Sequence, residues 1–258
     1  MYHFCVKTLS RRHKKKVVAA AAYRSGEHLY DERYKCFHNF TRKKGVVYSE
    51  ILLPPNAPLQ FRDREILWNT VERRETRSDS RLAREAEFAL PRECSLEEQI
   101  ALSRDFVMEN FVSLGMCADL CIHHRDERNP HAHVLLTDRP VDANGFAAKK
   151  DPGWNRKELI LVWRESWART LNREYERKGL EKRVTHESYQ TQGITDRKPT
   201  KHLGRRVLEY AKHHQATDRI LEHIEILQSD AERERFLNLL GLSREYEKER
   251  EHPYRRSR

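Results

Sequence analysis

The chain has 258 residues, of which 35% are charged and 38% hydrophobic, and it carries a formal net charge of +10. This length allows one large domain, or one domain with an appendage, and the basic surplus favours a polyanionic partner. No apolar run approaches the roughly 18 residues of a membrane span, so we expect no membrane insertion. Five scattered cysteines and an N-terminus without an apolar signal-peptide core predict a protein of the reducing cytoplasm.

Strand and helix patterns alternate through the first ninety or so residues. The alanine-rich run at residues 17–23 predicts a helix, because alanine has the highest helix propensity, and Gly26 can end it. A charged segment with a few apolar side chains predicts a second helix at residues 62–77. Strands are predicted at residues 2–6, 45–53 and 81–90, and a basic loop at residues 11–16.

A Ser-x-x-Glu capping box at Ser95 predicts the start of a third helix, which Gly115 ends. Two strands that carry histidines follow, and a long helix is then predicted from apolar side chains at helical spacing. A polar loop and a charged helical segment complete the chain. The predicted ranges are 116–123 and 131–137 for the strands, 156–178 for the long helix and 186–204 for the loop.

These patterns predict an α+β fold, in which helices pack on one face of an antiparallel β-sheet. The other sheet face would stay open and carry a metal site. We expect a main domain at residues 1–204 and a charged helical extension at residues 205–258.

The metal site is predicted from the segment Asn129-Pro130-His131-Ala132-His133. Residues two apart on a strand point to the same face, so His131 and His133 direct two imidazoles to one point. A third imidazole from a neighbouring strand would complete a three-nitrogen site for a divalent metal. A single histidine on a strand is usually structural or solvated, but two at this spacing with a third nearby favour metal binding.

The third ligand is either His123 or His124, which are adjacent. Residues 116, 118, 120 and 122 are all apolar and form the core-facing side of this strand. His123 then lies on the opposite face and is the predicted ligand. Cys117 and Cys121 offer an alternative pair of zinc ligands, although this spacing is also usual for small interior residues.

Tyr23 is the candidate nucleophile, because it follows the alanine run and the basic segment. A tyrosine can attack a phosphodiester and hold the product covalently. Core packing is the alternative role for a tyrosine in an alanine-rich helix. Tyr30 and Tyr34 are further candidates in a more polar, loop-like stretch.

Four segments, in this order, make the chain resemble the MobA/MobL family of plasmid relaxases, which includes staphylococcal nicking enzymes. They are Ala20–Gly26, Tyr48–Pro54, Ala83–Glu85 with Leu90-Pro91, and Ile122-His123 with Asn129–His133. The resemblance covers about four-fifths of the chain, from Tyr2 to Gly204. The segment that ends at His133 and the surroundings of Tyr23 are its specific parts.

The resemblance implies a histidine-hydrophobe-histidine endonuclease fold and site- and strand-specific nicking of plasmid DNA at an origin of transfer. It places the family's catalytic tyrosine at Tyr23, its metal histidines at His123, His131 and His133, and its acidic residue at Glu85. Glu85 would orient a metal-ligating histidine or help to deprotonate the tyrosine. A solvated position beside Glu87 on the strand is the alternative.

The expected reaction is a transesterification that uses a divalent metal ion, Mg²⁺ or Mn²⁺, at the scissile phosphate. Tyr23 attacks phosphorus and leaves a 5′-phosphotyrosine and a free 3′-hydroxyl, a polarity that the resemblance implies. The alternatives are a rolling-circle replication initiator or transposase with the same chemistry, and a non-catalytic DNA-binding remnant.

Basic residues near Tyr23 are predicted to hold the DNA backbone, although such a run can also be a solvated loop. They are Arg11, Arg12, Lys14, Lys15, Lys16 and Arg24. The resemblance further implies three kinds of partner: plasmid DNA that is single-stranded at the nick, accessory mobilisation proteins, and the coupling protein of a type IV secretion system.

Overall fold

The computed structural model describes residues 2–124, 129–196, 218–227 and 230–240, together with residues 203, 207 and 210. Contacts within the chain divide it into two compact units, Met1–His186 and Glu187–Arg258. All the site residues expected from the sequence belong to the first unit. None of the described helices is both long and apolar enough to cross a bilayer.

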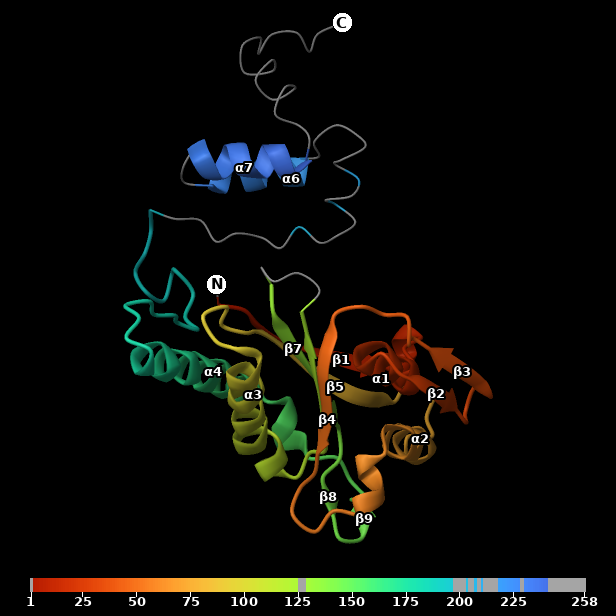
Figure 1. Ribbon diagram of the computed structural model, residues 1–258. Coiled ribbons are helices and arrows are strands. Elements are labelled where there is room, and N and C mark those ends of the chain that lie inside the picture. Colours follow the sequence, from red (N-terminus) through yellow and green to blue (C-terminus); the bar gives the residue numbers. More distant parts are fainter. Residues whose placement is uncertain are drawn as a thin grey trace, which may run out of the picture. The chain divides into compact units, whose positions relative to one another are not determined.

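The first unit is built on a sheet of five antiparallel strands in the order β1-β5-β7-β6-β4 (Figure 1). The strands are β1 (Phe4–Ser10), β4 (Val46–Leu52), β5 (Arg81–Ala89), β6 (Ala118–His123) and β7 (His131–Thr137). β7 lies in the centre, between β5 and β6. This order confirms the antiparallel α+β fold, and it brings both histidine-bearing strands into one sheet as neighbours.

Helices pack on both faces of this sheet (Figure 1). The helices are α1 (Val17–Ser25), α2 (Arg64–Arg74), α3 (Leu96–Asn110) and α4 (Lys157–Arg177). Short 3₁₀ turns are η1 (Arg11–His13), η2 (Leu59–Arg62), η3 (Val112–Leu114) and η4 (Pro152–Asn155). α3 begins at the expected capping box, in which Ser95 and Glu98 each bond the backbone N–H of the other.

The even-numbered side chains of β6 and β7 form the face that packs on α3 and α4. Leu120 and Val134 lie there with Phe106 of α3 and Trp167 of α4 in one fully buried cluster. The apolar parity that was expected for residues 116–122 is therefore confirmed. Burial of these large side chains supplies the main apolar contribution to the stability of the unit.

The opposite face is divided, which corrects the expectation that helices cover only one side of the sheet. Its odd-numbered side chains include the apolar Ala83, Cys117 and Leu135, which α1 and α2 cover. Farther along the same face, the odd positions become His131 and His133, which are half-buried. The sequence did not show which helices would cover the apolar part of this face.

Two short hairpins accompany the sheet, and the sequence predicted neither. They are β2 (His28–Asp31) with β3 (Cys36–Asn39), and β8 (Val141–Asp142) with β9 (Gly145–Phe146). The stretch around Tyr30, expected to be loop-like, is thus a strand. The first hairpin packs beside α1 (Figure 1).

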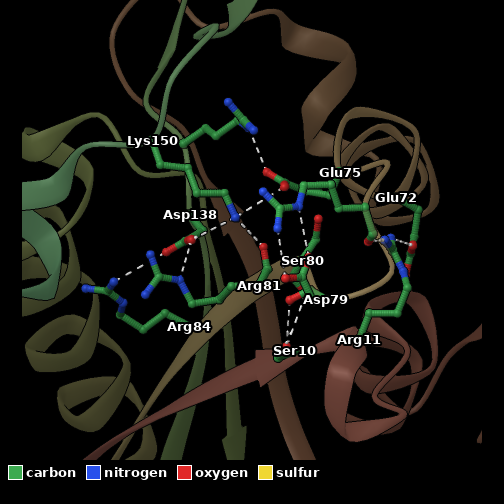
Figure 2. A network of polar contacts seen from close by, with 12 residues as sticks. Ser10, Arg11, Glu72, Glu75, Asp79, Ser80, Arg81, Arg84, Asp138 and Lys150 are labelled. Carbon is green, nitrogen blue, oxygen red and sulfur yellow. Dashed lines mark hydrogen bonds and ion pairs between the residues drawn. The ribbon is translucent and has the colours of Figure 1, made fainter.

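A buried network of charges joins the sheet to its surroundings at the end away from the histidines. Figure 2 shows Asp138, which follows β7, with Arg81, Arg84 and Lys150 around its carboxylate. Lys150 also pairs with Glu75 just after α2. Because Asp138 is 3% exposed, its charge is compensated by these cations rather than by water.

The second unit contains α6 (Asp218–Ile226) and α7 (Asp230–Leu240). Their apolar side chains form a small cluster that includes Ile220, Ile224, Leu237 and Leu240. Helical structure is therefore present in the expected charged extension. The other residues of 205–258, apart from 207, 210 and 227, lie outside the described part of the chain.

Candidate metal centre and catalytic site

His123, His131 and His133 form a compact group on the sheet face that also carries α1. The antiparallel register of β6 and β7 places His123 directly opposite His131, and His133 lies two residues along on the same side of β7. The three ring centroids are 4.7 to 5.5 Å apart. One potential ligand atom from each ring lies within 4.8 Å of the others, which is close enough for a shared metal ion.

Each of the three rings is oriented by a hydrogen bond from one of its nitrogens to an oxygen. The partners are the carbonyl oxygen of Arg24 for Nε2 of His123 (2.7 Å), that of Asn129 for Nδ1 of His131 (2.8 Å), and Oε1 of Glu85 for Nδ1 of His133 (2.8 Å). Metal-ligating histidines commonly make such a bond with the nitrogen that does not ligate. Three imidazoles with one nitrogen each within 4.8 Å of the others are a donor set that fits a divalent ion.

Burial favours the neutral, metal-binding form of two of these rings. It lowers the pKa of His123 to about 3, against a smaller opposing effect of the bond to the Arg24 carbonyl. Burial also lowers the pKa of His131. A neutral imidazole keeps the lone pair that a metal requires, so these two rings need not lose a proton at neutral pH.

The alternative ligands named from the sequence lie elsewhere or are chemically unsuited. Nε2 of His124 is 2.7 Å from Oε1 of Gln99 on α3, on the opposite face of the sheet. Cys117 is buried in the cluster under α1 and α2. Cys121 shares the histidine face, but burial raises the pKa of its thiol well above the ordinary value and disfavours a thiolate ligand.

Glu85 lies beneath the histidines on β5 and is 5% exposed. Its carboxylate accepts the bond from His133 and two further bonds from Arg24, whose Nε and Nη2 are each 2.7 Å from a carboxylate oxygen. Burial opposes ionisation of this carboxyl group, but the bonds from His133 and Arg24 outweigh it and hold its pKa well below the usual range. Glu85 is therefore an ionised acceptor and not a solvated strand residue.

Tyr23 lies on the exposed side of α1, close to His123. Its side chain is 50% exposed, because Val18, Ala22 and Ser25 turn the other side of the helix inward. Nζ of Lys43 lies 3.9 Å from the centroid of the Tyr23 ring and 3.4 Å from Nε2 of His123. The candidate nucleophile and the candidate metal site are thus separated by a single ammonium group.

Sequence reasoning missed Lys43 and Phe40. Nζ of Lys43 also donates to the carbonyl oxygen of Tyr23 at 2.6 Å, and the ring of Phe40 packs edge-on against Tyr23 with centroids 5.3 Å apart. Burial lowers the pKa of Lys43 to about 8. The run Arg42-Lys43-Lys44 was the available signal, but nothing local in the sequence linked it to α1.

The other two tyrosines lie on the neighbouring hairpin. The ring of Tyr30 packs against Phe37 at 4.9 Å, and Nζ of Lys16 lies 4.0 Å from the centroid of the Tyr34 ring. These ring contacts are made with the hairpin and the basic loop, not with the histidine group.

The expected DNA-contacting residues divide into exposed and buried side chains. Arg12, Lys14 and Lys15 are exposed. Arg11 is different, because its guanidinium is buried and its Nη2 lies 2.6 Å from Oε2 of Glu72. Arg11 thus contributes to the ion-pair network of Figure 2 and is removed from the DNA-contacting set.

Arg24 is also committed within the protein. Besides its two bonds to Glu85, its Nη1 donates to the carbonyl oxygen of Ala20 at 2.7 Å. All three guanidinium nitrogens of Arg24 are thus bonded within the protein, so the side chain orients neighbouring groups and is not free to bind a ligand. It too is removed from the DNA-contacting set.

Comparison with known proteins places this arrangement in a family. The MobA/MobL family model matches residues 15–213. The chain is similar to the conjugal transfer protein TraA of Agrobacterium fabrum, at 36% identity over 232 residues. It is also similar to the mobilization protein MobL of Acidithiobacillus ferridurans, at 33% identity over 237 residues.

A solved structure from work on the molecular basis of vancomycin resistance transfer in Staphylococcus aureus is similar as well. It has 38% sequence identity and a TM-score of 0.69, and the match covers 73% of this chain and all of that one. The matches cover 78% of this chain but 21% of TraA, and 79% of this chain but 62% of MobL. On the matched residues and the shared fold, the chain belongs to the MobA/MobL family.

Proposed function

We propose that this chain nicks plasmid DNA at an origin of transfer and holds the cut strand covalently on Tyr23. The observation that carries the proposal is the position of Tyr23, with its exposed side chain next to His123 across the ammonium group of Lys43. The names of the relatives, which refer to conjugal transfer and mobilisation, support the same function. Residues 1–204 would form the nicking domain.

His123, His131 and His133 would hold the divalent ion. When bound there, such an ion acts as a Lewis acid on a phosphoryl oxygen and offsets charge in the transition state. The chain positions these ligands by the three hydrogen bonds from the rings to Arg24, Asn129 and Glu85. The sheet supplies the rigid support, because two of the ligands project from its central strand.

Tyr23 would supply the nucleophile for a transesterification. The bond from its phenolic oxygen to phosphorus forms while the bond from phosphorus to the 3′ oxygen breaks. The leaving 3′ oxygen takes up a proton and becomes a hydroxyl, and the phenol loses one. Attack by this hydroxyl on the 5′-phosphotyrosine reverses the step and reseals the strand, so bond energy is conserved.

Glu85 and Arg24 would act as positioning residues in this reaction. A carboxylate with a strongly lowered pKa is a weak base, which favours the orienting role over deprotonation of Tyr23. Its bond to His133 fixes that ring, and its ion pair with Arg24 fixes the end of α1 that carries Tyr23. A single carboxylate would thereby set the geometry of both halves of the site.

Exposed cations just before α1 would bind the backbone of single-stranded plasmid DNA. Arg12, Lys14, Lys15 and the half-buried Lys16 remain in this set. Accessory mobilisation proteins and a type IV secretion coupling protein would be the protein partners.

The test is a covalent-adduct assay. The purified chain is incubated with labelled single-stranded DNA from the region flanking its own gene, with Mg²⁺ or Mn²⁺ or with a chelator, and run on a denaturing gel. We expect a shifted covalent band that requires the metal and disappears on protease treatment. If no adduct forms with either strand of that region or with the supercoiled plasmid, the proposal is wrong.

A further inference from the structure

The outer face of the β2–β3 hairpin carries a cluster of three rings that the reaction at Tyr23 does not use. The register pairs Tyr30 with Phe37 and His28 with Asn39, so His28, Tyr30 and Phe37 share one side of the hairpin. The ring of Phe37 lies between the other two, with centroid distances of 4.7 Å to His28 and 4.9 Å to Tyr30. These three residues are called the aromatic cluster below.

The inner face of the hairpin already provides its attachment to the protein. Leu29 is buried in the cluster of α1 and α2, and Asp31 is fully buried, with Oδ2 3.2 Å from Nε2 of His38. The aromatic cluster therefore does not hold the hairpin in place. Phe37 is nevertheless 63% exposed, and together with its two neighbouring rings it forms an exposed aromatic group of the kind that marks interaction sites.

The segment that carries the aromatic cluster is rich in exposed cations. Lys35, Arg42 and Lys44 are exposed, and Lys16 lies over the ring of Tyr34 in the turn of the hairpin. The two acidic side chains of this segment are occupied, since Asp31 pairs with His38 and Glu32 with Arg73. Exposed rings in a segment rich in lysine and arginine suit single-stranded nucleic acid, in which bases stack on the rings and phosphates meet the cations.

The hairpin is also connected to the proposed reaction site. Phe40 directly follows β3, its N–H donates to the carbonyl oxygen of Glu27, which precedes β2 at the same open end of the hairpin, and its ring packs on Tyr23. A DNA strand held at Tyr23 therefore lies next to the hairpin, on the side of Tyr23 that contacts Phe40. Strand geometry puts Phe37 and Phe40 about 10 Å apart along the chain, at about 3.3 Å per residue.

We propose that the aromatic cluster is a base-stacking subsite for single-stranded DNA, with Phe37 as its central platform. The inference rests on the proposed function, because it takes the strand flanking the nick as the ligand. Stacking on a ring accepts every base, so this subsite would hold the strand without reading its sequence. Recognition of the origin would come from other residues.

The test measures binding of fluorescein-labelled oligo(dT) by anisotropy, with Phe37→Leu against Phe37→Tyr. Leucine keeps an apolar side chain but removes the stacking ring, whereas tyrosine keeps the ring. We expect Phe37→Leu to weaken binding by about fivefold to a hundredfold, the range for loss of one base–aromatic stack, and Phe37→Tyr to bind as the wild type does. Leu161→Ala on α4, which removes another exposed apolar side chain, is the matched control and should leave affinity unchanged.

The outcomes separate this inference from the proposed nicking. Equal oligo(dT) affinity for Phe37→Leu and the wild type would overturn the subsite. A Phe37→Leu protein that differs from the wild type only in its self-association, measured by sedimentation, would overturn it too. Tyr23→Phe should keep the oligo(dT) affinity and lose the covalent adduct. A wild-type protein that shows the Phe37 effect but never forms an adduct would retain the subsite and contradict the nicking proposal.

Discussion

Arg24 of α1 and Glu85 of β5 form an ion pair through two hydrogen bonds, each 2.7 Å long. Arg24 directly follows Tyr23 in the chain, and the same carboxylate accepts a bond from His133. One buried side chain thus connects the helix of the proposed nucleophile to the proposed metal ligands. A substitution of Glu85 should therefore affect both this helix and the metal ligands.

The first prediction is that Glu85→Gln weakens metal binding. The amide keeps the shape of the side chain but loses the charge that orients His133, and loss of such a partner typically costs about 10- to 100-fold in metal affinity. Calorimetric titration with Mn²⁺ measures the effect. Glu93→Gln is the control, because the Glu93 carboxylate pairs with Lys182 at 2.7 Å and not with the histidine group, and a Glu85→Gln protein with wild-type affinity would contradict the orienting role.

The second prediction concerns the acid stability of the metal-free protein. The pKa of Glu85 is lower in the folded chain than the unfolded value of about 4.3, so folding favours its ionised form. This contribution to the free energy of unfolding is fully present above about pH 5 and is lost as the pH falls towards the folded pKa. Urea midpoints between pH 3 and 7 should fall less steeply on acidification for Glu85→Gln than for the wild type; parallel curves would speak against the linkage.

The third prediction is that His131→Ala and His133→Ala each remove metal binding and nicking together. Loss of one of three nitrogens should cost more than the roughly 100-fold upper range for a supporting residue. His124→Ala is the matched control, since that ring faces Gln99 on the other side of the sheet. Retention of full Mn²⁺ affinity in both variants would remove the metal site from this position.

The fourth prediction separates the chemistry of Tyr23 from its packing. Tyr23→Phe removes only the hydroxyl, so the edge-on contact with Phe40 remains. We expect an unchanged melting temperature, metal affinity and DNA affinity, and no covalent adduct. Tyr30→Phe and Tyr34→Phe should still form the adduct, and mass spectrometry that finds DNA on either of them would show that Tyr23 is not the nucleophile.

The fifth prediction concerns the basic loop before α1. Single-stranded DNA binding should weaken with salt by about 0.7 log units per phosphate contact for each tenfold rise in salt. Substitution of Lys14, Lys15 and Lys16 by glutamine together should reduce that slope by up to about two units. The measurement is oligo(dT) affinity between low and physiological salt, and a slope equal to that of the wild type would place these lysines outside the DNA path.

Some features of the structure depend only on residues that are neighbours in the sequence, and others depend on contacts between distant residues. The capping box at Ser95 and the end of α1 at Gly26 depend on a few neighbouring residues, and both occur as expected; Gly26 adopts a φ of +73°, which glycine permits. The pairing of Glu85 with Arg24, 61 residues apart in the chain, has no local pattern. The burial of Arg11 against Glu72 has no local pattern either, and the same holds for the approach of Lys43 to Tyr23.

The sequence by itself determined the histidine face. A period of two along a strand fixes which side chains share a side, so the apolar run up to Ile122 and the His131–His133 spacing were enough to select His123 over His124. It also determined the family, through short segments whose order was informative. These features depend on spacing along one element, which the sequence states directly.

Only the tertiary structure decided what surrounds that face. The strand order β1-β5-β7-β6-β4 brings Glu85 beside His133. The packing of α1 on the same side brings Tyr23 near His123, and the segment between β3 and β4 brings Lys43 to both. The tertiary structure also pairs Arg11 with Glu72 and Arg24 with Glu85 inside the protein. Contacts between distant segments depend on which apolar surfaces are buried together, and the pattern within one segment does not contain that choice.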